Sequence, residues 1–162
     1  MTIRKTNPLR QIKRQPKILA LGEGKQVNVD GIEFTYKVSG EDTEGHFAFT
    51  EGIVAPHRGA PAHIHHLEDE AFYVLEGKFE IECADESFRA GPGSFVLLPK
   101  GLPHRFQNIS EKPGRLLCVQ SPSGVEQFFE HMSALNEEGL PDQERLHQLT
   151  AKYGIEFLSD QK

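Results

Sequence analysis

The sequence predicts an all-β domain of the sandwich, jelly-roll or barrel type, followed by a short helical extension. Three observations carry this prediction. The middle of the chain contains many short strand-like stretches, several of which alternate apolar and polar residues. Glycine and proline separate these stretches, as at Gly77, at residues 91–93 and at residues 99–101. After Pro122 the apolar residues recur at helical spacing instead.

The predicted strands follow one another closely along the chain. Alternation is clearest over residues 32–38, where every second residue is apolar, and it recurs over residues 78–83. Apolar stretches with strand character also cover residues 71–75, 94–98 and 115–120. Short strands at this spacing are typical of sandwiches, jelly rolls and barrels.

Two helices are predicted in the last part of the chain. The first should begin near Ser123 and end before Gly139, and the second should run from Asp142 to Gly154. The segment 155–158 either adds an edge strand or plugs one end of a barrel. The apolar residues of the first helix share one face, which is expected to pack on the sheet. These residues are Val125, Phe128, Phe129, Met132 and Leu135.

Length and composition favour one packed domain. The chain has 162 residues, of which 37% are hydrophobic and 11 are Phe, so a buried core is expected. We expect a basic N-terminal arm over residues 1–25, a barrel over about 26–121 and the helical extension over 122–162. No apolar run is long enough to cross a bilayer, and the first residues lack the apolar stretch of a secretory signal. A cytoplasmic protein without a membrane partner is therefore expected.

The charge is uneven along the chain. The formal net charge is -6, yet residues 1–17 carry six basic side chains and no acidic one. The rest of the chain is therefore strongly acidic and would repel the phosphates of a nucleic acid. We expect no nucleic-acid partner. The basic arm is interpreted as a free segment, or as one laid across the acidic body or a partner subunit.

The two cysteines, Cys83 and Cys118, do not form a C-x-x-C pair. Both lie in apolar stretches that are predicted to be strands. We expect them to be free thiols that behave as small apolar side chains, rather than partners in a disulfide.

Three histidines lie close together in the sequence. Alternate residues of a strand point to the same face, so His63 and His65 present their imidazoles side by side while His66 points away. Glu70 follows the pair and can turn back toward it. Further along the chain, His104 begins a predicted strand after a turn that contains glycine and proline.

Three imidazoles and one carboxylate form a mixed nitrogen and oxygen site for one divalent transition metal. Such a site suits iron, manganese, nickel, cobalt, copper or zinc, and it leaves one or two positions open for water, dioxygen or substrate. Because the ligands come from separate segments, a bound metal would also tie strands together and stabilise the fold. The predicted metal ligands are His63, His65, Glu70 and His104.

The spacing of these residues resembles the two sequence motifs of the cupin superfamily. The first motif is matched by His63-x-His65, four residues, Glu70, six residues and Gly77. The second is matched by Gly93, five residues, Pro99-x-Gly101, two residues, His104, three residues and Asn108. The lead-in loop departs from the pattern, because His57 stands where the family often has glycine.

The resemblance implies a cupin jelly-roll barrel, also called a double-stranded β-helix, with the metal inside and the four residues above as its ligands. Phe72 and Phe106 should point inward and form the substrate pocket, so a small and largely apolar ligand is expected in the barrel. Glu68 and Asp69 are interpreted as a solvated turn, with Glu68 as an alternative ligand. Asn108 is expected to secure the backbone rather than to take part in chemistry.

The chain resembles bacterial single-domain cupins of the quercetin-dioxygenase-like group. That resemblance implies a metal-dependent dioxygenase that acts on a small hydroxylated aromatic, with Glu70 both as ligand and as general base. Two alternatives stay open. One is a non-oxidative metalloenzyme, such as an isomerase or lyase, and the other is a non-enzymatic barrel that binds a small molecule. Because cupins commonly dimerise, a homodimer is expected.

Overall fold

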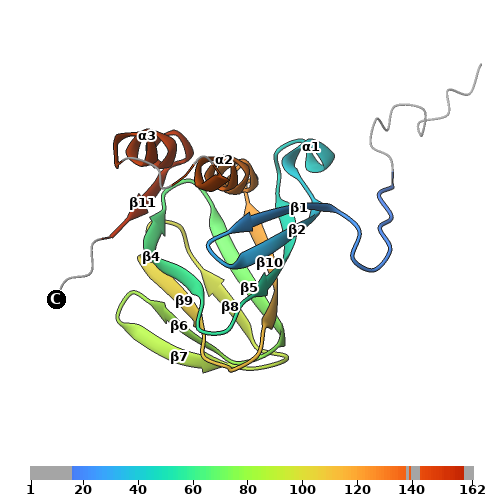
Figure 1. The fold of residues 1–162 in the computed structure, drawn as a ribbon, viewed down its shortest axis with the longest axis vertical. Coiled ribbons are helices and arrows are strands. Elements are labelled where there is room, and N and C mark those ends of the chain that lie inside the picture. Colours follow the sequence, from blue (N-terminus) through green and yellow to red (C-terminus); the bar gives the residue numbers. More distant parts are fainter. Residues whose placement is uncertain (1–15, 138, 140–142, 159–162) are drawn as a thin grey trace, which may run out of the picture.

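Two antiparallel sheets face each other and enclose the interior of the protein (Figure 1). The structure is a computed structural model that describes residues 16–137, 139 and 143–158 of the 162-residue chain. Most of the predicted basic arm therefore lies outside the described residues. In spatial order, the six-stranded sheet contains β1 (Lys25–Val29), β2 (Ile32–Val38), β3 (Ala48–Val54), β10 (Gly114–Ser121), β5 (Asp69–Glu76) and β8 (Phe95–Leu98).

The second sheet has five strands and carries much of the candidate site. Its last strand in the sequence, β11, pairs with β4 at the edge of the sheet, which decides between the two roles that the sequence left open for this segment. In spatial order, the sheet contains β11 (Ile155–Phe157), β4 (Gly59–His65), β9 (His104–Asn108), β6 (Phe79–Cys83) and β7 (Glu86–Ala90).

Three helices complete the described fold. The single turn α1 (Gly40–Thr43) joins β2 to β3, whereas α2 (Val125–Glu137) and α3 (Gln143–Tyr153) follow the last strand of the first sheet. Figure 1 shows α2 and α3 together at one end of the barrel, near β4 and β11. No helix in the described part of the chain is long and apolar enough to cross a membrane.

The fold class predicted from the sequence is confirmed, including the helical extension. The strand predicted over residues 32–38 coincides with β2, and β5, β6, β8 and β10 overlap the other predicted strands. Three strands were not predicted, namely β1, β3 and β7. Their sequences explain why: β3 is interrupted by Gly52, and most residues of β7 are polar and exposed.

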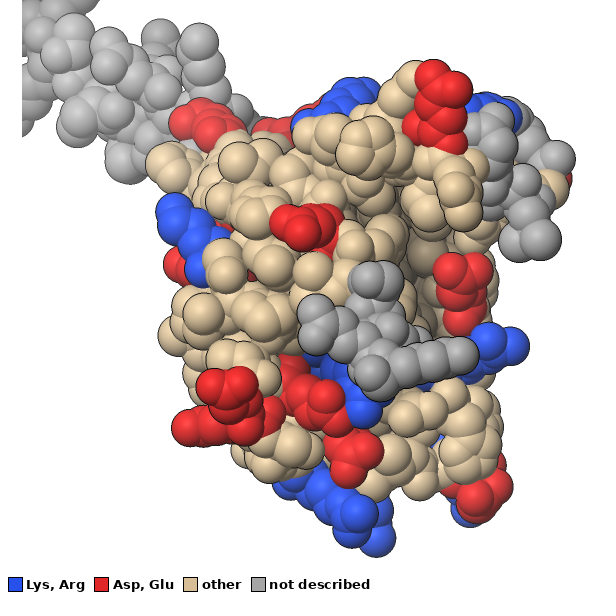
Figure 2. All heavy atoms as spheres, turned by 90° about the vertical axis from the view of Figure 1, so that its left-hand side faces the viewer, with Lys and Arg blue, Asp and Glu red and all other residues tan. Residues whose placement is uncertain are grey.

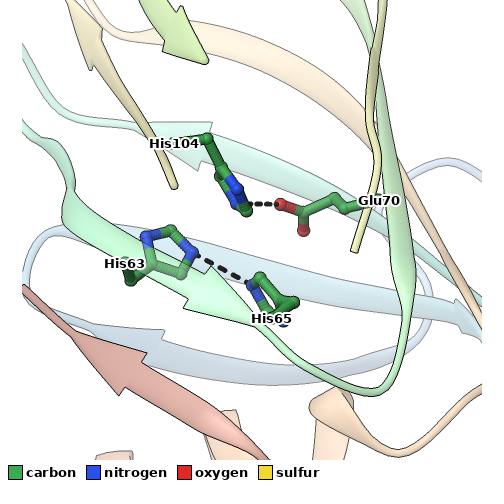
Figure 3. Close-up of side chains that lie close together, drawn as sticks. All are labelled: His63, His65, Glu70 and His104. Carbon is green, nitrogen blue, oxygen red and sulfur yellow. Dashed lines mark hydrogen bonds and ion pairs between the residues drawn. The ribbon is translucent and has the colours of Figure 1, made fainter. Parts of the chain in front are cut away.

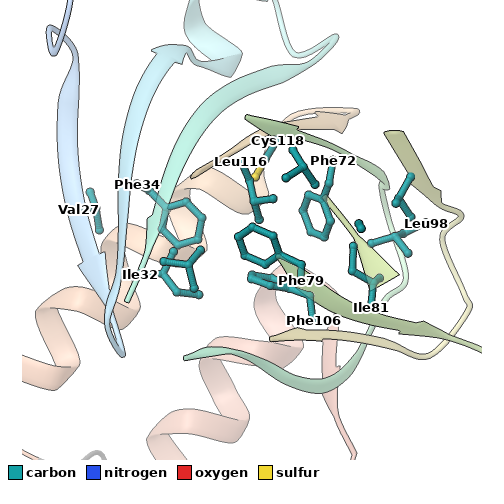
Figure 4. Packing of buried hydrophobic residues seen from close by; sticks show 14 of the residues in the cluster. Val27, Ile32, Phe34, Phe72, Phe79, Ile81, Leu98, Phe106, Leu116 and Cys118 are labelled. Atoms are coloured by element: carbon teal, nitrogen blue, oxygen red, sulfur yellow. The ribbon is translucent and has the colours of Figure 1, made fainter. Parts of the chain in front are cut away.

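The core is filled by side chains that point inward from the strands of both sheets (Figure 4). Along β10 every second residue is buried, as expected for a strand with one face on the core. Cys118 belongs to this buried row and Cys83 is half-buried, and both are free thiols as predicted. The largest fully buried apolar side chains are Phe72, Phe79, Ile81, Leu98 and Leu116.

Gly59 fixes how closely β4 approaches β9. A Cβ atom at this position would lie 1.9 Å from the carbonyl oxygen of Phe106, so a side chain cannot be accommodated without a shift of the backbone. The same two strands pair His63 with His104 further along. The glycine therefore permits the strand contact that sets two predicted metal ligands opposite each other.

The outside of the molecule is mixed in charge on the side where β11 and α3 lie. On the face shown in Figure 2, acidic and basic side chains are interspersed and uncharged residues cover most of the surface. This face therefore offers no broad basic area among the described atoms.

Candidate metal centre

The four predicted ligands converge inside the barrel (Figure 3). His63 and His65 come from β4, Glu70 from β5, and His104 is the first residue of β9. All four side chains are buried, and one ligand atom from each lies within 4.8 Å of the others. Residues from three strands of two sheets therefore form one cluster that could hold a metal ion.

The imidazole nitrogens of the cluster face one another at short range. The Nε2 atoms of His63 and His65 are 3.0 Å apart, and the Nε2 atom of His104 lies 3.5 Å from Oε2 of Glu70. Among the described residues, the buried Nε2 atom of His104 has no hydrogen-bond partner. A buried polar atom without a partner is costly unless something else occupies its lone pair.

The outer nitrogen of each ring is held by the protein. Nδ1 of His63 lies 2.7 Å from the carbonyl oxygen of Pro61, and Nδ1 of His104 lies 3.1 Å from that of Leu102. Nδ1 of His65 lies 2.6 Å from Oε1 of Glu68. Because a carbonyl oxygen only accepts, Nδ1 of His63 and of His104 must carry the proton, and the carboxylate favours the same tautomer for His65.

This arrangement fits a bound metal. With their protons on Nδ1, the three rings direct bare Nε2 lone pairs at one point, next to the carboxylate of Glu70. Lone pairs so close together repel one another unless a cation lies between them. Nitrogen and oxygen donors of this kind suit the divalent transition metals from manganese to zinc.

The protonation of the cluster follows from its neighbours. Burial, together with the nearby His104 and His65, lowers the pKa of His63 to about 4, so its imidazole is neutral at pH 7. Burial alone would lower the pKa of His65 as well, but the hydrogen bond to Glu68 and the charge of Glu70 raise it.

Glu70 keeps its negative charge despite being buried. Burial would raise its pKa, yet the neighbouring imidazoles of His104 and His65 and the hydrogen bond from Gln120 hold the pKa at about 2. Its other oxygen, Oε1, accepts a hydrogen bond of 2.8 Å from Nε2 of Gln120, which lies opposite it on β10. The two carboxylate oxygens of Glu70 therefore have different surroundings: Oε1 accepts the hydrogen bond from Gln120, and Oε2 faces His104.

The interpretation of Glu68 as part of a solvated turn is wrong. Its side chain is buried and its carboxylate supports His65 from behind. It is not among the four clustered ligands either. Asp69 is exposed as expected and accepts a hydrogen bond from the backbone of Lys100.

The interpretations of His66 and Asn108 agree with the structure. His66 points away from the cluster, is exposed and lies 2.9 Å from a carboxylate oxygen of Glu156. His57 is exposed and pairs with Glu111. The side chain of Asn108 donates to the carbonyl oxygens of Val54 and Lys112, so it secures the backbone as predicted.

An apolar cavity of about 100 Å³ lies beside the cluster. His63, His65 and Glu70 form one part of its wall. Phe72 and Phe106 are buried as expected and line this cavity, where they contact each other edge to face with ring centroids 5.1 Å apart. Their role as a substrate pocket stays a prediction. The structure thus places a small apolar space against the predicted metal ligands.

A second part of the cavity wall was not predicted as such. Phe34 on β2, three side chains of α2 and Phe157 on β11 also line the cavity. The helical stripe was predicted to pack on the sheet, and no sequence pattern distinguished core packing from cavity lining. The three residues of α2 are Phe128, Phe129 and Met132.

The fold and the site define a class of protein, a small β-barrel with a buried cluster of three histidines and one glutamate. Residues 50–120 match the cupin domain family. That segment contains all four clustered residues. The match covers less than half of the chain but includes the whole candidate site.

Similar proteins come from several bacteria. Polyketide synthase CurC from Streptomyces cyaneus is 26% identical over 80 residues, which are 49% of this chain and 52% of that protein. The structure of the polyketide cyclase RemF from Streptomyces resistomycificus is 28% identical, with a TM-score of 0.58, and the alignment covers 67% of this chain and 81% of that one.

More distant structures support the fold alone. A predicted oxalate decarboxylase from Thermotoga maritima has a TM-score of 0.61 at 17% identity, and the alignment covers 65% of this chain and 98% of that one. The matches to curated relatives span between half and three fifths of those proteins' lengths, 60% and 52% for the first two.

Proposed function

We propose that the protein is a metal-dependent enzyme that acts on a small hydroxylated aromatic molecule. One observation carries the proposal: three Nε2 atoms with fixed outer protons and one carboxylate converge on a point in the wall of an apolar cavity. The residues that would hold the metal are His63, His65, Glu70 and His104.

The chemistry divides between the metal and the protein. A divalent transition metal held by these residues would supply a Lewis acid for an oxygen donor of the substrate. The faces of Phe72 and Phe106 would orient an aromatic ring and keep water away. Glu70, which is ionised and hydrogen-bonded on one side only, is placed to accept the proton of a substrate hydroxyl.

Two reaction classes follow from this arrangement. The resemblance to the quercetin-dioxygenase-like group favours oxidation of the aromatic by dioxygen. The similarity to polyketide cyclase RemF favours a second candidate, a reaction without dioxygen in which deprotonation of the substrate leads to ring closure or isomerisation. Both reactions use the same base and the same cavity.

Oxygen uptake separates the two candidates. The protein would be loaded in turn with iron, manganese, cobalt, nickel, copper and zinc, and incubated with catechols and other hydroxylated aromatics in an oxygen electrode. Uptake that requires both metal and substrate supports the dioxygenase. Turnover without uptake supports the non-oxidative enzyme.

The control is His104→Ala, which removes one donor and should abolish either activity. Tight metal and ligand binding without turnover on any compound would instead favour a binding protein. A wild-type protein that binds none of the six metals would refute the proposal as a whole.

We also propose that the protein forms a homodimer through the outer face of β5 and β8. Tyr73, Phe95 and Leu97 lie on this face and are 44%, 65% and 57% exposed. Within the described residues, β8 is the edge of its sheet, and Phe95 lies opposite Tyr73. An apolar face next to an open strand edge favours pairing with a second copy of the chain.

Light scattering after gel filtration tests the homodimer. The wild type should have twice the monomer mass, and the double variant Phe95→Glu, Leu97→Lys should be monomeric. A monomeric wild type would refute the dimer and leave the proposed chemistry unaffected.

A further inference from the structure

Two of the aromatic rings that line the cavity come from opposite parts of the sequence and contact each other. Phe34 on β2 and Phe129 on α2 are stacked, with ring centroids 4.2 Å apart and planes inclined by 3°. Both rings line the cavity, and both lie outside the segment that matches the cupin family. The four clustered ligands thus belong to the family segment, whereas this part of the wall does not.

Several contacts hold the stacked pair in place. The hydroxyl of Tyr36 on β2 donates to the backbone carbonyl of Glu126 near the start of α2. The buried carboxylate of Glu126 accepts from the backbone amides of Gly40 and Gly124, at 2.9 and 2.7 Å. Near the other end of the helix, the amide of Asn136 donates to Asp30.

The last of these contacts, between Asn136 and Asp30, lies at the cavity itself. Asp30 is in the turn that precedes β2 and is one of the residues that line the cavity. The helix that carries Phe129 is therefore fixed to the strand pair that carries Phe34 near both of its ends. Closely packed interiors of this kind resist deformation, so the distance between this wall and the metal ligands is set by the fold.

The volume of the cavity limits what it can hold. At about 100 Å³ it is smaller than the cavity of roughly 150 Å³ that binds benzene in an engineered protein. One aromatic ring fits with small adjustments of the lining. A fused two-ring or three-ring molecule requires that the stacked pair separate or be removed.

We infer that the stacked pair Phe34–Phe129 determines substrate size and restricts the site to ligands with a single aromatic ring. The inference rests on the proposed function for where the oxygen atoms of the ligand lie, but the size limit follows from the cavity alone. It narrows the substrate class to monocyclic hydroxylated aromatics.

The size limit is tested by binding of phenol and 2-naphthol to the protein as purified. Dissociation constants are measured from shifts of backbone amide resonances of cavity-lining residues. The larger compound is the more apolar, so without a size limit it would bind more tightly. We expect the wild type to prefer phenol.

Variants of Phe129 should change the preference for phenol over 2-naphthol. Phe129→Ala removes one of the stacked rings and should strengthen 2-naphthol binding by about tenfold while phenol binding changes little. Phe129→Leu, which keeps an apolar side chain, should shift the preference in the same direction by less, and it serves if the alanine variant does not fold. The matched control is Phe88→Ala, because Phe88 is half-buried and packs on the core but is not among the lining residues.

The outcomes separate this inference from the proposed function. A wild type that binds 2-naphthol more tightly than phenol, or binds neither, overturns the size limit, as does an unchanged preference in both Phe129 variants. A third measurement uses cobalt-loaded protein and catechol. If cobalt does not tighten catechol binding while the phenol preference holds, the proposed function fails and the size limit stands.

Discussion

Two carboxylates of this protein, Glu51 and Glu70, have low pKa values for different reasons. Glu51 lies on the outer side of β3, where hydrogen bonds from Arg115 and then Lys37 hold its pKa below the usual value of 4.5. Glu70 lies inside the barrel, and its polar partners in the described part of the chain are His104 and Gln120. Glu51 is therefore neutralised by basic side chains of the protein itself, whereas Glu70 is surrounded by imidazoles.

The difference indicates which cluster requires a cation. The network around Glu51 is complete, because two basic side chains balance its charge. The cluster around Glu70 has three converging nitrogen lone pairs and a negative charge with no Lys or Arg paired to it among the described residues. A buried charge requires a partner, so we expect the cluster around Glu70 to bind a cation from solution.

Removal of one inner donor should have the largest effect. His104→Ala is expected to weaken cobalt binding by about a hundredfold, or about 2.7 kcal/mol, because one of four ligands is lost. Isothermal titration of the metal-free protein measures the change. Unaltered occupancy by elemental analysis would remove His104 from the set of ligands.

Loss of the support behind Glu70 should have a smaller effect. Gln120→Leu removes the hydrogen bond to Oε1 and should weaken cobalt binding by about tenfold, the lower end of the range for residues that orient a ligand. Thr50→Val is the matched control, since Thr50 is also fully buried on the inner face and its hydroxyl has no hydrogen-bond partner in the described part of the chain. Equal cobalt affinity in Gln120→Leu and wild type would contradict the role of Gln120.

The outer network should respond to pH rather than to metal. The pKa of Glu51 is lower in the folded state than the usual 4.5, so its stabilisation is present above pH 4.5 and is lost as the pH falls through the folded value. Glu51→Gln should therefore reduce the free energy of unfolding by up to about 1 kcal/mol at pH 7, and the difference should vanish in strong acid. Urea titrations across the pH range test this, and a difference that persists in acid would contradict it.

The smallest effect is expected at His66, which is next to a ligand in the sequence but not in space. His66→Ala should leave cobalt affinity unchanged, because the side chain is exposed and paired with Glu156. A clear loss of affinity would show that the strand presents its faces differently in solution.

The four clustered ligands and the inward-facing Phe72 and Phe106 were predictable from the sequence, whereas the aromatic lining from β2, α2 and β11 was not. His63 and His65 share a face because of the two-residue period of a strand, and His104 follows a turn whose residues define its geometry. The prediction for Glu68 was wrong because its burial depends on how the turn after β4 folds back onto His65, and no periodicity of the sequence predicts that turn. The contact of Phe34 with Phe129 joins the start of the fold to its last helices, and only tertiary packing determines it.

The pairing of β11 with β4 has a consequence for biosynthesis. Ile155 and Phe157 pair with His65 and His63, and the nearby partners His66 and Glu156 are 90 residues apart in the chain. At roughly 5–20 residues per second, a ribosome needs about 5 to 18 s to supply the covering strand after the histidine strand has been made. During that interval β4, the strand with two of the clustered histidines, is an uncovered sheet edge that could pair with another chain.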